Sequence, residues 1–194
     1  MARPGPNMSK PAAPPLVALL QTPSLRLAIK WAEHRGDGVS VGAAVYPNGR
    51  VEPVVRVHHG PAPIYIRDLG KCLLVMGYLE VPEAVRVKLA AAPSEERSAF
   101  LYELREILMS CPRIGFALAP GDVTESGRIE RVGLDQTLQV AENDPGSFNR
   151  FCDAVQETET VLLRVLERMR AFAAHHEPPS TYSSGTAPPT DIYR

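Results

Sequence analysis

Hydrophobic side chains recur every three or four residues in three stretches of this 194-residue chain. The spacing predicts amphipathic helices over residues 23–35 and 145–174, and a third that begins at Ser94 and ends at Cys111. The first and last helices would each place proline at their first position, where its missing N–H costs nothing. The residues predicted to cap the three helices are Thr22, Ser94 and Asp144.

A second pattern predicts a β-hairpin. Residues 39–46 and 51–58 are rich in valine and flank residues 47–50, whose Asn-Gly pair suits the positive φ of a tight turn. We therefore expect these two segments to pair as antiparallel strands. Pro53 lies inside the returning strand and favours an edge position or a bulge, because proline donates no hydrogen bond to a neighbouring strand.

Shorter apolar runs predict further strands. Val85, Val87 and Leu89 alternate with two basic residues, which is the period of a half-buried strand. Within the predicted strand at residues 71–79, residues 72–78 are apolar on both sides, as expected of a central strand, and a short buried helix is the alternative. The strands predicted after the hairpin are residues 64–67, 71–79, 84–89, 113–119, 128–132 and 136–140.

The order of these elements is helix, strands, helix, strands, long helix, or α-β(3–5)-α-β(2–3)-α. Such an order is typical of an α+β fold, with helices gathered on one face of an antiparallel sheet. This order, the early hairpin and the pattern Phe148-x-x-Phe151-x-x-Ala154-Val155 resemble the type III secretion chaperone-like fold, which includes YbjN-like proteins. The resemblance covers residues 23–172. It implies a protein that dimerises and binds segments of other proteins without chemistry.

The last predicted helix is unusually long. At 1.5 Å per residue it would extend over about 45 Å, which is more than a small sheet covers, and Glu159 interrupts its apolar face. We therefore expect its C-terminal half, residues 161–172, to project or to pack on a partner subunit. The candidate partner-binding residues are Leu162, Val165, Leu166, Met169 and Phe172.

Composition separates the ends of the chain from its body. Proline occurs 19 times, and residues 1–15 and 175–194 combine it with Ser, Thr, Ala and Gly, as disordered tails do. A single α+β domain is expected over residues 16–174. The net charge of −1 indicates no general affinity for nucleic acid or anionic lipid, and no apolar run approaches the roughly 20 residues of a membrane span. Without a recognisable export signal, we expect a cytoplasmic protein.

Residues that could carry catalysis or bind a metal are scarce. Cys72, Cys111 and Cys152 are far apart and form no CxxC pair, which argues against a zinc site. His58 and His59 are adjacent in a predicted strand, so their side chains point to opposite faces. No phosphate-binding glycine motif and no hydrolase nucleophile elbow is present. We therefore expect no catalytic, cofactor-binding or metal-binding residues.

These observations favour a non-enzymatic, chaperone-like module for protein binding or assembly that acts as a homodimer. An alternative is an accessory factor on a nucleoprotein complex. It would bind RNA, DNA or a ribosome through Arg164, Arg168 and Arg170, late in the last helix. An enzyme of another kind is a third hypothesis, which a deep pocket with converging polar groups would favour.

Overall fold

A computed structural model describes residues 22–45, 49, 51–58, 60, 62–119, 128–141 and 143–174. The two predicted tails, residues 1–15 and 175–194, lie outside the described residues, as do residues 16–21 of the predicted domain. Most of the predicted hairpin turn is also outside them. Gly49 is described, and its φ of 78° is the positive value that a tight turn requires.

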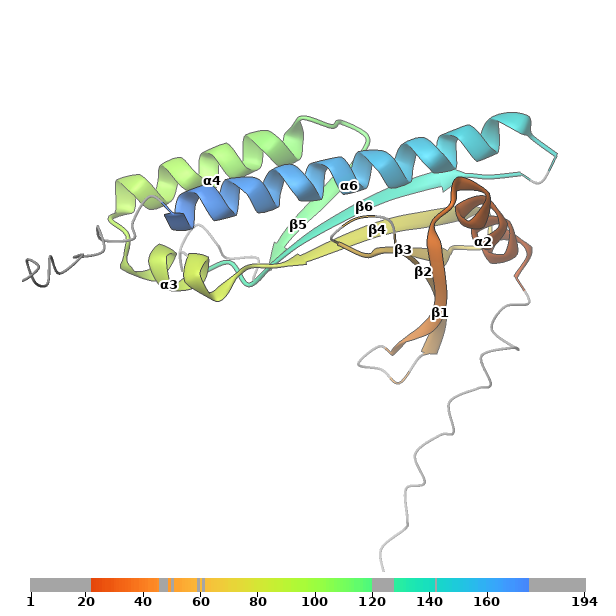
Figure 1. The fold of residues 1–194 in the computed structure, drawn as a ribbon, viewed down its shortest axis with the longest axis horizontal. Coiled ribbons are helices and arrows are strands. Elements are labelled where there is room, and N and C mark those ends of the chain that lie inside the picture. The colour runs from red at the N-terminus through yellow and green to blue at the C-terminus, as the bar shows by residue number, and fades with distance from the viewer. Residues whose placement is uncertain are drawn as a thin grey trace, which may run out of the picture.

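Six strands form one open sheet, in which every neighbouring pair is antiparallel. Their spatial order is β1-β2-β3-β4-β6-β5, so the last strand in the sequence lies inside the sheet. In Figure 1, β1 and β2 run steeply across the direction of β4 and β6, because the twist between neighbouring strands accumulates across a sheet. The strands are β1 Gly38–Val45, β2 Val51–His58, β3 Ile64–Asp68, β4 Cys72–Glu80, β5 Gly115–Ala119 and β6 Arg131–Gln139.

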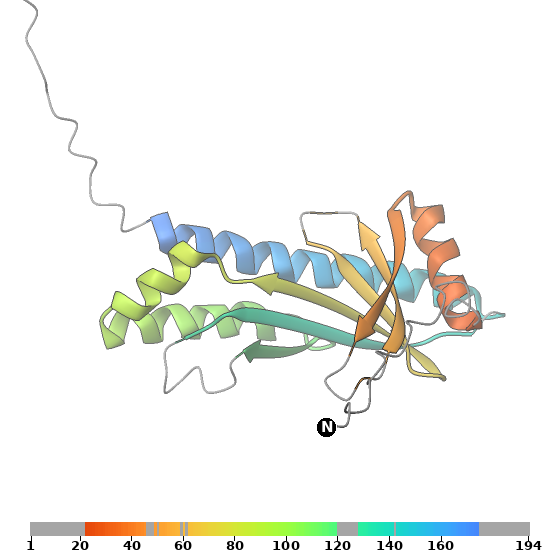
Figure 2. The same cartoon turned by 90° about the horizontal axis from the view of Figure 1, so that it is seen from below.

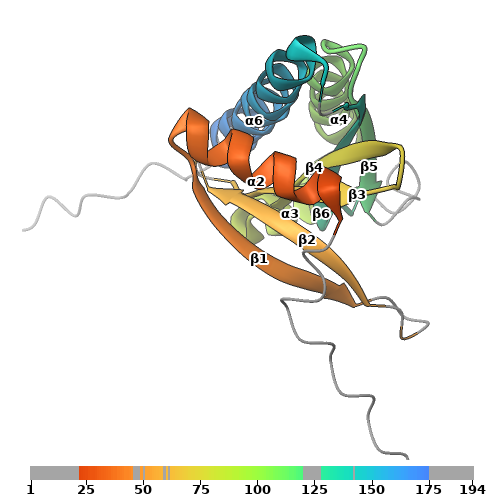
Figure 3. The same cartoon turned by 90° about the vertical axis from the view of Figure 1, so that its right-hand side faces the viewer.

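The helices of the described residues cover one face of this sheet. Helix α2 contacts β1 to β4, and α6 contacts β3, β4 and β6. Helices α3 and α4 pack against α6, and Figure 3 shows α4 and α6 side by side above the strands. The helices are α2 Pro23–Arg35, α3 Glu83–Ala91, α4 Ser94–Met109 and α6 Pro145–Ala174. The α+β class, the element order and the long C-terminal helix are therefore confirmed.

Alternation along the strands decides which side chains meet the helices. In β2, Val55 and Val57 are fully buried in the core that α2 and α6 share, whereas Arg56 between them is exposed. In β6, Val132 and Leu134 are buried in the same way. The other phase of each strand points to the opposite face, which no described helix covers.

One predicted strand is wrong: residues 84–89 belong to helix α3. Val85 and Leu89 are buried, while Val87 is 63% exposed. The buried pair is four residues apart and therefore shares one face of a helix, a spacing that also fits strand alternation over so short a stretch. The intervening valine is the residue that distinguishes the two patterns.

The remaining strand predictions need smaller corrections. The two segments predicted at 128–132 and 136–140 form one continuous strand, β6, which starts at Arg131. Residues 72–80 are strand β4, not the alternative helix. Pro53 lies in β2, an inner strand, but β3 pairs with β2 only at residues 55–57. At Pro53 the strand therefore has a described partner on the β1 side alone, which is the edge-like setting that proline favours.

The C-terminal half of α6 does not project from the domain. Helix α3, which the sequence pattern did not predict, and α4 extend the helical layer and cover this half. The Phe172 ring lies 4.2 Å from the Phe100 ring of α4, measured between centroids, and Lys88 Nζ of α3 lies 4.0 Å from the Phe172 centroid. The end of the long helix is thus packed within the same chain.

One predicted helix cap stands in place without a side-chain hydrogen bond, and another is displaced by one residue. Thr22 stands at the N-cap of α2, but its side chain donates and accepts no capping hydrogen bond. Pro93 occupies the N-cap of α4, and Ser94 is the first helical residue. Only the third predicted cap, Asp144, uses its side chain, as described below.

Candidate binding surface

The uncovered face of the sheet, defined as the face opposite α2 and α6, is the surface over which the described part of the chain places no helix. In the view from below (Figure 2) the strands lie in front of α4 and α6. Strand register places Arg56, Tyr65, Met76 and Asp135 side by side in one row across β2, β3, β4 and β6. Residues far apart in the sequence thereby form one continuous surface.

This face contains a hollow of about 670 Å³, which we call the sheet-face hollow. Its floor is apolar: Val54 and Met76 each have an exposed fraction of only 7%. Tyr65 and Tyr78 lie beside the floor with ring centroids 5.6 Å apart, and the Tyr78 hydroxyl donates to Met76 Sδ at 3.3 Å. One wall is the edge strand β1, from residue 40 to residue 44.

Small residues of β1 leave room for this hollow. Gly42 stands opposite Val54 in the β1–β2 register, and a methyl group built on Gly42 would meet no atom within 4 Å. Ser40 and Ala44 are also small and share the same face. A strand with larger side chains at these positions would fill the space.

The charges that line the sheet-face hollow are of one sign. Arg56, Arg67 and Arg131 belong to the lining, and no aspartate or glutamate among the described residues does. The Arg67 guanidinium pairs with Glu52, and Arg131 pairs with Glu80 at 2.7 Å. The Arg56 guanidinium lies over the Tyr65 ring, 5.8 Å from its centroid, and has no carboxylate partner within the described part of the chain.

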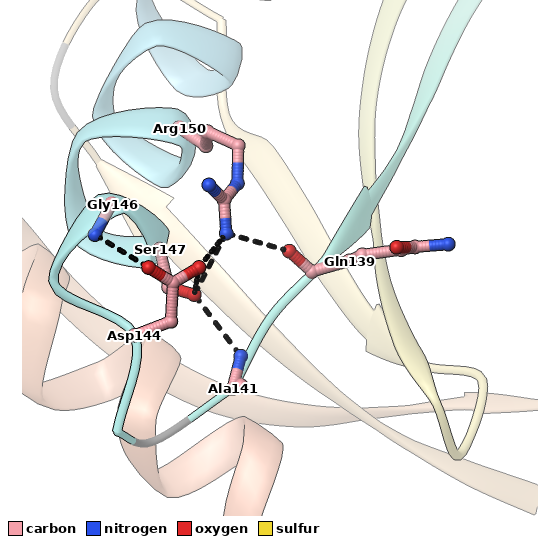
Figure 4. A network of polar contacts seen from close by, with 6 residues as sticks. All are labelled: Gln139, Ala141, Asp144, Gly146, Ser147 and Arg150. Atoms are coloured by element: carbon pink, nitrogen blue, oxygen red, sulfur yellow. Dashed lines mark hydrogen bonds and ion pairs between the residues drawn. The ribbon is translucent and has the colours of Figure 1, made fainter.

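A second hollow, of about 860 Å³, lies between β6 and the start of α6. Its charged lining is mixed: Arg113, Arg150 and Asp153. Arg150 serves to anchor the helix, because its guanidinium pairs with Asp144, donates to Ser147 Oγ at 3.0 Å and reaches the Gln139 carbonyl at 3.5 Å (Figure 4). These contacts give the Arg150 side chain a structural role at the start of α6.

The same network starts helix α6. The Gly146 N–H donates to Asp144 Oδ1 at 2.9 Å, which confirms the predicted cap (Figure 4). Hydrogen bonding from Arg150, and then from the Gly146 N–H, lowers the pKa of Asp144. Ser147 Oγ in turn accepts from the Ala141 N–H at 3.0 Å, so the network also fixes the chain leaving β6.

Comparisons with known proteins show the fold alone. No protein-family model matches the sequence, and no curated protein matches it. An uncharacterised protein from Methanothermobacter thermautotrophicus has a similar structure, with a TM-score of 0.60 and 16% identity over 76% of this chain and 97% of that one. YbjN from E. coli gives a TM-score of 0.43 and 15% identity over 79% of this chain and 94% of that one. The first likeness shows that the α+β fold is shared.

Four of the five candidate partner-binding residues predicted from the sequence lie in the core of the chain itself. Leu162, Val165, Met169 and Phe172 are at most 4% exposed, and Leu166 is half-buried. They contact the sheet and the other helices instead of forming an open apolar face. Their hydrophobic spacing is thus accounted for within one subunit.

Two of the three late-helix arginines are also engaged within the chain. Arg164 Nη1 donates to Ser110 Oγ at 3.0 Å. Arg168 pairs with Glu103, and its guanidinium lies 5.3 Å from the Phe100 ring centroid. Arg170 is exposed. Nucleic-acid binding through these residues stays a prediction from the sequence.

Among the residues that the structure describes, the histidines and cysteines form no cluster. In that part of the chain, no group of three His, Cys, Asp or Glu side chains could hold a metal ion. His58 Nε2 lies 3.1 Å from Ser40 Oγ across the β1–β2 pair, and His59 is outside the described residues. Burial raises the pKa of the Cys152 thiol, which disfavours the reactive thiolate at neutral pH. In the same described part, no helix is long and apolar enough to cross a membrane.

Sequence reasoning missed the sheet-face hollow. The available signal was the outward phase of β3 and β4, where Tyr65 and Tyr78 occupy positions that a solvated face usually gives to polar residues. Finding the hollow also required the register that brings Arg56 beside Tyr65.

Proposed function

We propose that this chain is a non-enzymatic binding module that holds a segment of another protein in the sheet-face hollow. The observation that carries the proposal is the contrast between the two faces. One is closed by helices, and the other has a concave apolar floor beside two tyrosines and three arginines. Concave sites with an apolar floor and a few placed polar groups are typical of ligand-binding surfaces.

The lining of the hollow supports binding in preference to catalysis. Among the described residues it contains no carboxylate, cysteine or histidine. Carboxylate and histidine bases and a cysteine nucleophile are therefore absent from it. Its wall does contain Ser40, whose Oγ lies 3.1 Å from His58 Nε2, but no carboxylate among the described lining residues completes a triad. Arginine and tyrosine are instead residues that dominate the energetics of protein interfaces.

A chaperone-like role in a homodimer is the finer form of this proposal. The buried end of α6 is not the surface for it, so self-association would use the uncovered face or the free edge of β1. Light scattering across a range of concentrations measures the oligomeric state. A dimer that Gly42→Trp disrupts would support this form, and a monomer at every concentration would overturn it.

Selection from a random peptide library displayed on phage tests the proposed function. The wild-type chain should enrich peptides whose binding Tyr78→Ala abolishes, because this side chain lies beside the floor of the hollow. Tyr102→Ala is the matched control, since Tyr102 is an exposed tyrosine on α4. No enrichment, or peptides that bind both variants equally well, would refute the proposal.

A further inference from the structure

We propose that the sheet-face hollow receives an extended peptide that carries an acidic residue, with the carboxylate placed against Arg56. The proposal rests on the function proposed above and specifies the chemistry of the partner. Three features carry it: the charge of the lining, the free edge of β1, and the apolar floor.

The positive charge of the lining favours an anionic group in the bound peptide. Of the residues that the structure describes, three arginines and no carboxylate line the hollow. Two of them are paired with glutamates, Arg67 with Glu52 and Arg131 with Glu80. The Arg56 guanidinium lies over the Tyr65 ring and forms no ion pair with a carboxylate of the described residues. A carboxylate from the peptide would supply the charge-assisted hydrogen bonds that the guanidinium fork favours.

The free edge of β1 favours a bound peptide in an extended conformation. Only β2 pairs with β1 in the described residues, and residues 40–44 of β1 line the hollow. The strand GVSVGAAV contains none of the charges or prolines that usually protect an edge from further pairing. Five residues span about 16 Å of edge, enough for a short strand to add its main-chain hydrogen bonds.

The apolar floor determines the second side chain of the peptide. In an extended segment, residues two apart point to the same side. An acidic residue directed at Arg56, across from Ser40, therefore places its neighbour two positions away beside Val54, across from the small residue Gly42. The expected pattern is an acidic residue and an apolar residue separated by one position.

A nucleic acid fits this surface less well than a peptide. Glu52 and Glu80 border the arginines, and Asp135 follows Met76 in the row across the sheet. These carboxylates would repel successive phosphates. A single acidic side chain meets only Arg56, and the strand edge offers main-chain pairing that a nucleic acid cannot use.

Peptides recovered from the random library test this inference. They should carry an acidic residue, and replacing it with glutamine should weaken binding about tenfold, the effect of losing one charge-assisted contact. Arg56→Gln should weaken the acidic peptide equally and leave the glutamine peptide unchanged. Arg86→Gln, at an exposed position on α3, is the control and should have no effect. Hydrogen exchange should show new protection at the amides of residues 40–44 in the complex.

Several outcomes would overturn the inference. If the recovered peptides lack acidic residues and bind Arg56→Gln as tightly as the wild type, this inference is refuted and the proposed function still stands. Protection outside β1, or tighter binding of a single-stranded oligonucleotide than of the peptides, would also overturn it. So would a homodimer in which β1 amides are already protected and from which the peptides are excluded. Failure to recover any peptide sensitive to Tyr78→Ala refutes the proposed function itself.

Discussion

The two faces of the same sheet differ in how much space surrounds their glycines. On the helix-covered face, a methyl group built on Gly77 would lie 2.5 Å from Leu162 Cδ1 and 2.9 Å from Thr158 Cγ2. On the uncovered face, a methyl group on Gly42 would meet nothing within 4 Å. The covered face is closely packed at Gly77, whereas the described residues leave open space at Gly42 on the uncovered face. Packing on the first face stabilises the fold, and the space on the second is available to a ligand.

The largest expected effect lies on the covered face, at the end of α6. Met169 is fully buried, and Met169→Ala should lower the free energy of unfolding by about 2–5 kcal/mol through lost burial and a cavity. Met109→Ala is the control, since Met109 is 66% exposed, and should change it by less than about 0.5 kcal/mol. Urea denaturation measures both. Equal effects would mean that this end of α6 is not packed as described.

The paired glycines give the next largest effect. Gly77→Val should destabilise the chain by about 1–3 kcal/mol, because the added atoms overlap Leu162 and Thr158. Gly42→Val should have little effect or a slight stabilising one, because the space is open and valine suits a strand. The denaturant midpoints of the two variants measure this difference. An equal loss of stability in both would contradict the proposed difference in packing between the two faces.

The cap of α6 should contribute a smaller effect that depends on pH. Asp144→Asn removes the carboxylate that Arg150 and the Gly146 N–H bind and should lower the melting temperature by about 2–4 °C at pH 7. The pKa of Asp144 is lowered in the folded chain. Its stabilisation is therefore complete above the unfolded pKa of about 3.9 and is lost as pH falls through the lower folded pKa.

Thermal melts of wild type and Asp144→Asn across this pH range check that prediction. The two curves should converge below about pH 4. Asp153→Asn, about two and a half turns further along the same helix and exposed, should match the wild type throughout. A gap between wild type and Asp144→Asn that persists unchanged in acid would contradict a role for the ionised carboxylate.

Much of this fold followed from local patterns in the sequence. The positions of the first helix, the β1–β2 pair and the capped start of α6 depend on neighbours within a few residues, such as Asp144 followed by Pro145. Helix α3 was missed because Val85 and Leu89 fit both a helix and a strand. The end of α6 was misplaced as a consequence, because α3 and α4 supply the side chains that cover it.

The candidate site was not predictable in the same way. It depends on the pairing of β2 with β3 and of β3 with β4, which brings Arg56, Tyr65 and Met76 into one row. It also depends on the twist that turns β1 into a wall. Both are properties of the whole sheet, and neither can be inferred from the spacing of residues along the chain.

The smallest expected effects on stability, and the largest on binding, belong to the uncovered face. Tyr78→Ala and Arg56→Gln should each change the free energy of unfolding by less than about 1 kcal/mol, because neither side chain is part of the buried core. Denaturation of both variants beside the wild type measures this. A larger loss would mean that the face has a structural role.

The affinity of a selected peptide for the wild type, Tyr78→Ala and Tyr102→Ala is the most direct test of the claim that the uncovered face is a binding surface. Fluorescence anisotropy gives the three dissociation constants. We expect a loss of about tenfold or more for Tyr78→Ala and no change for Tyr102→Ala. Equal affinity for all three proteins would contradict it.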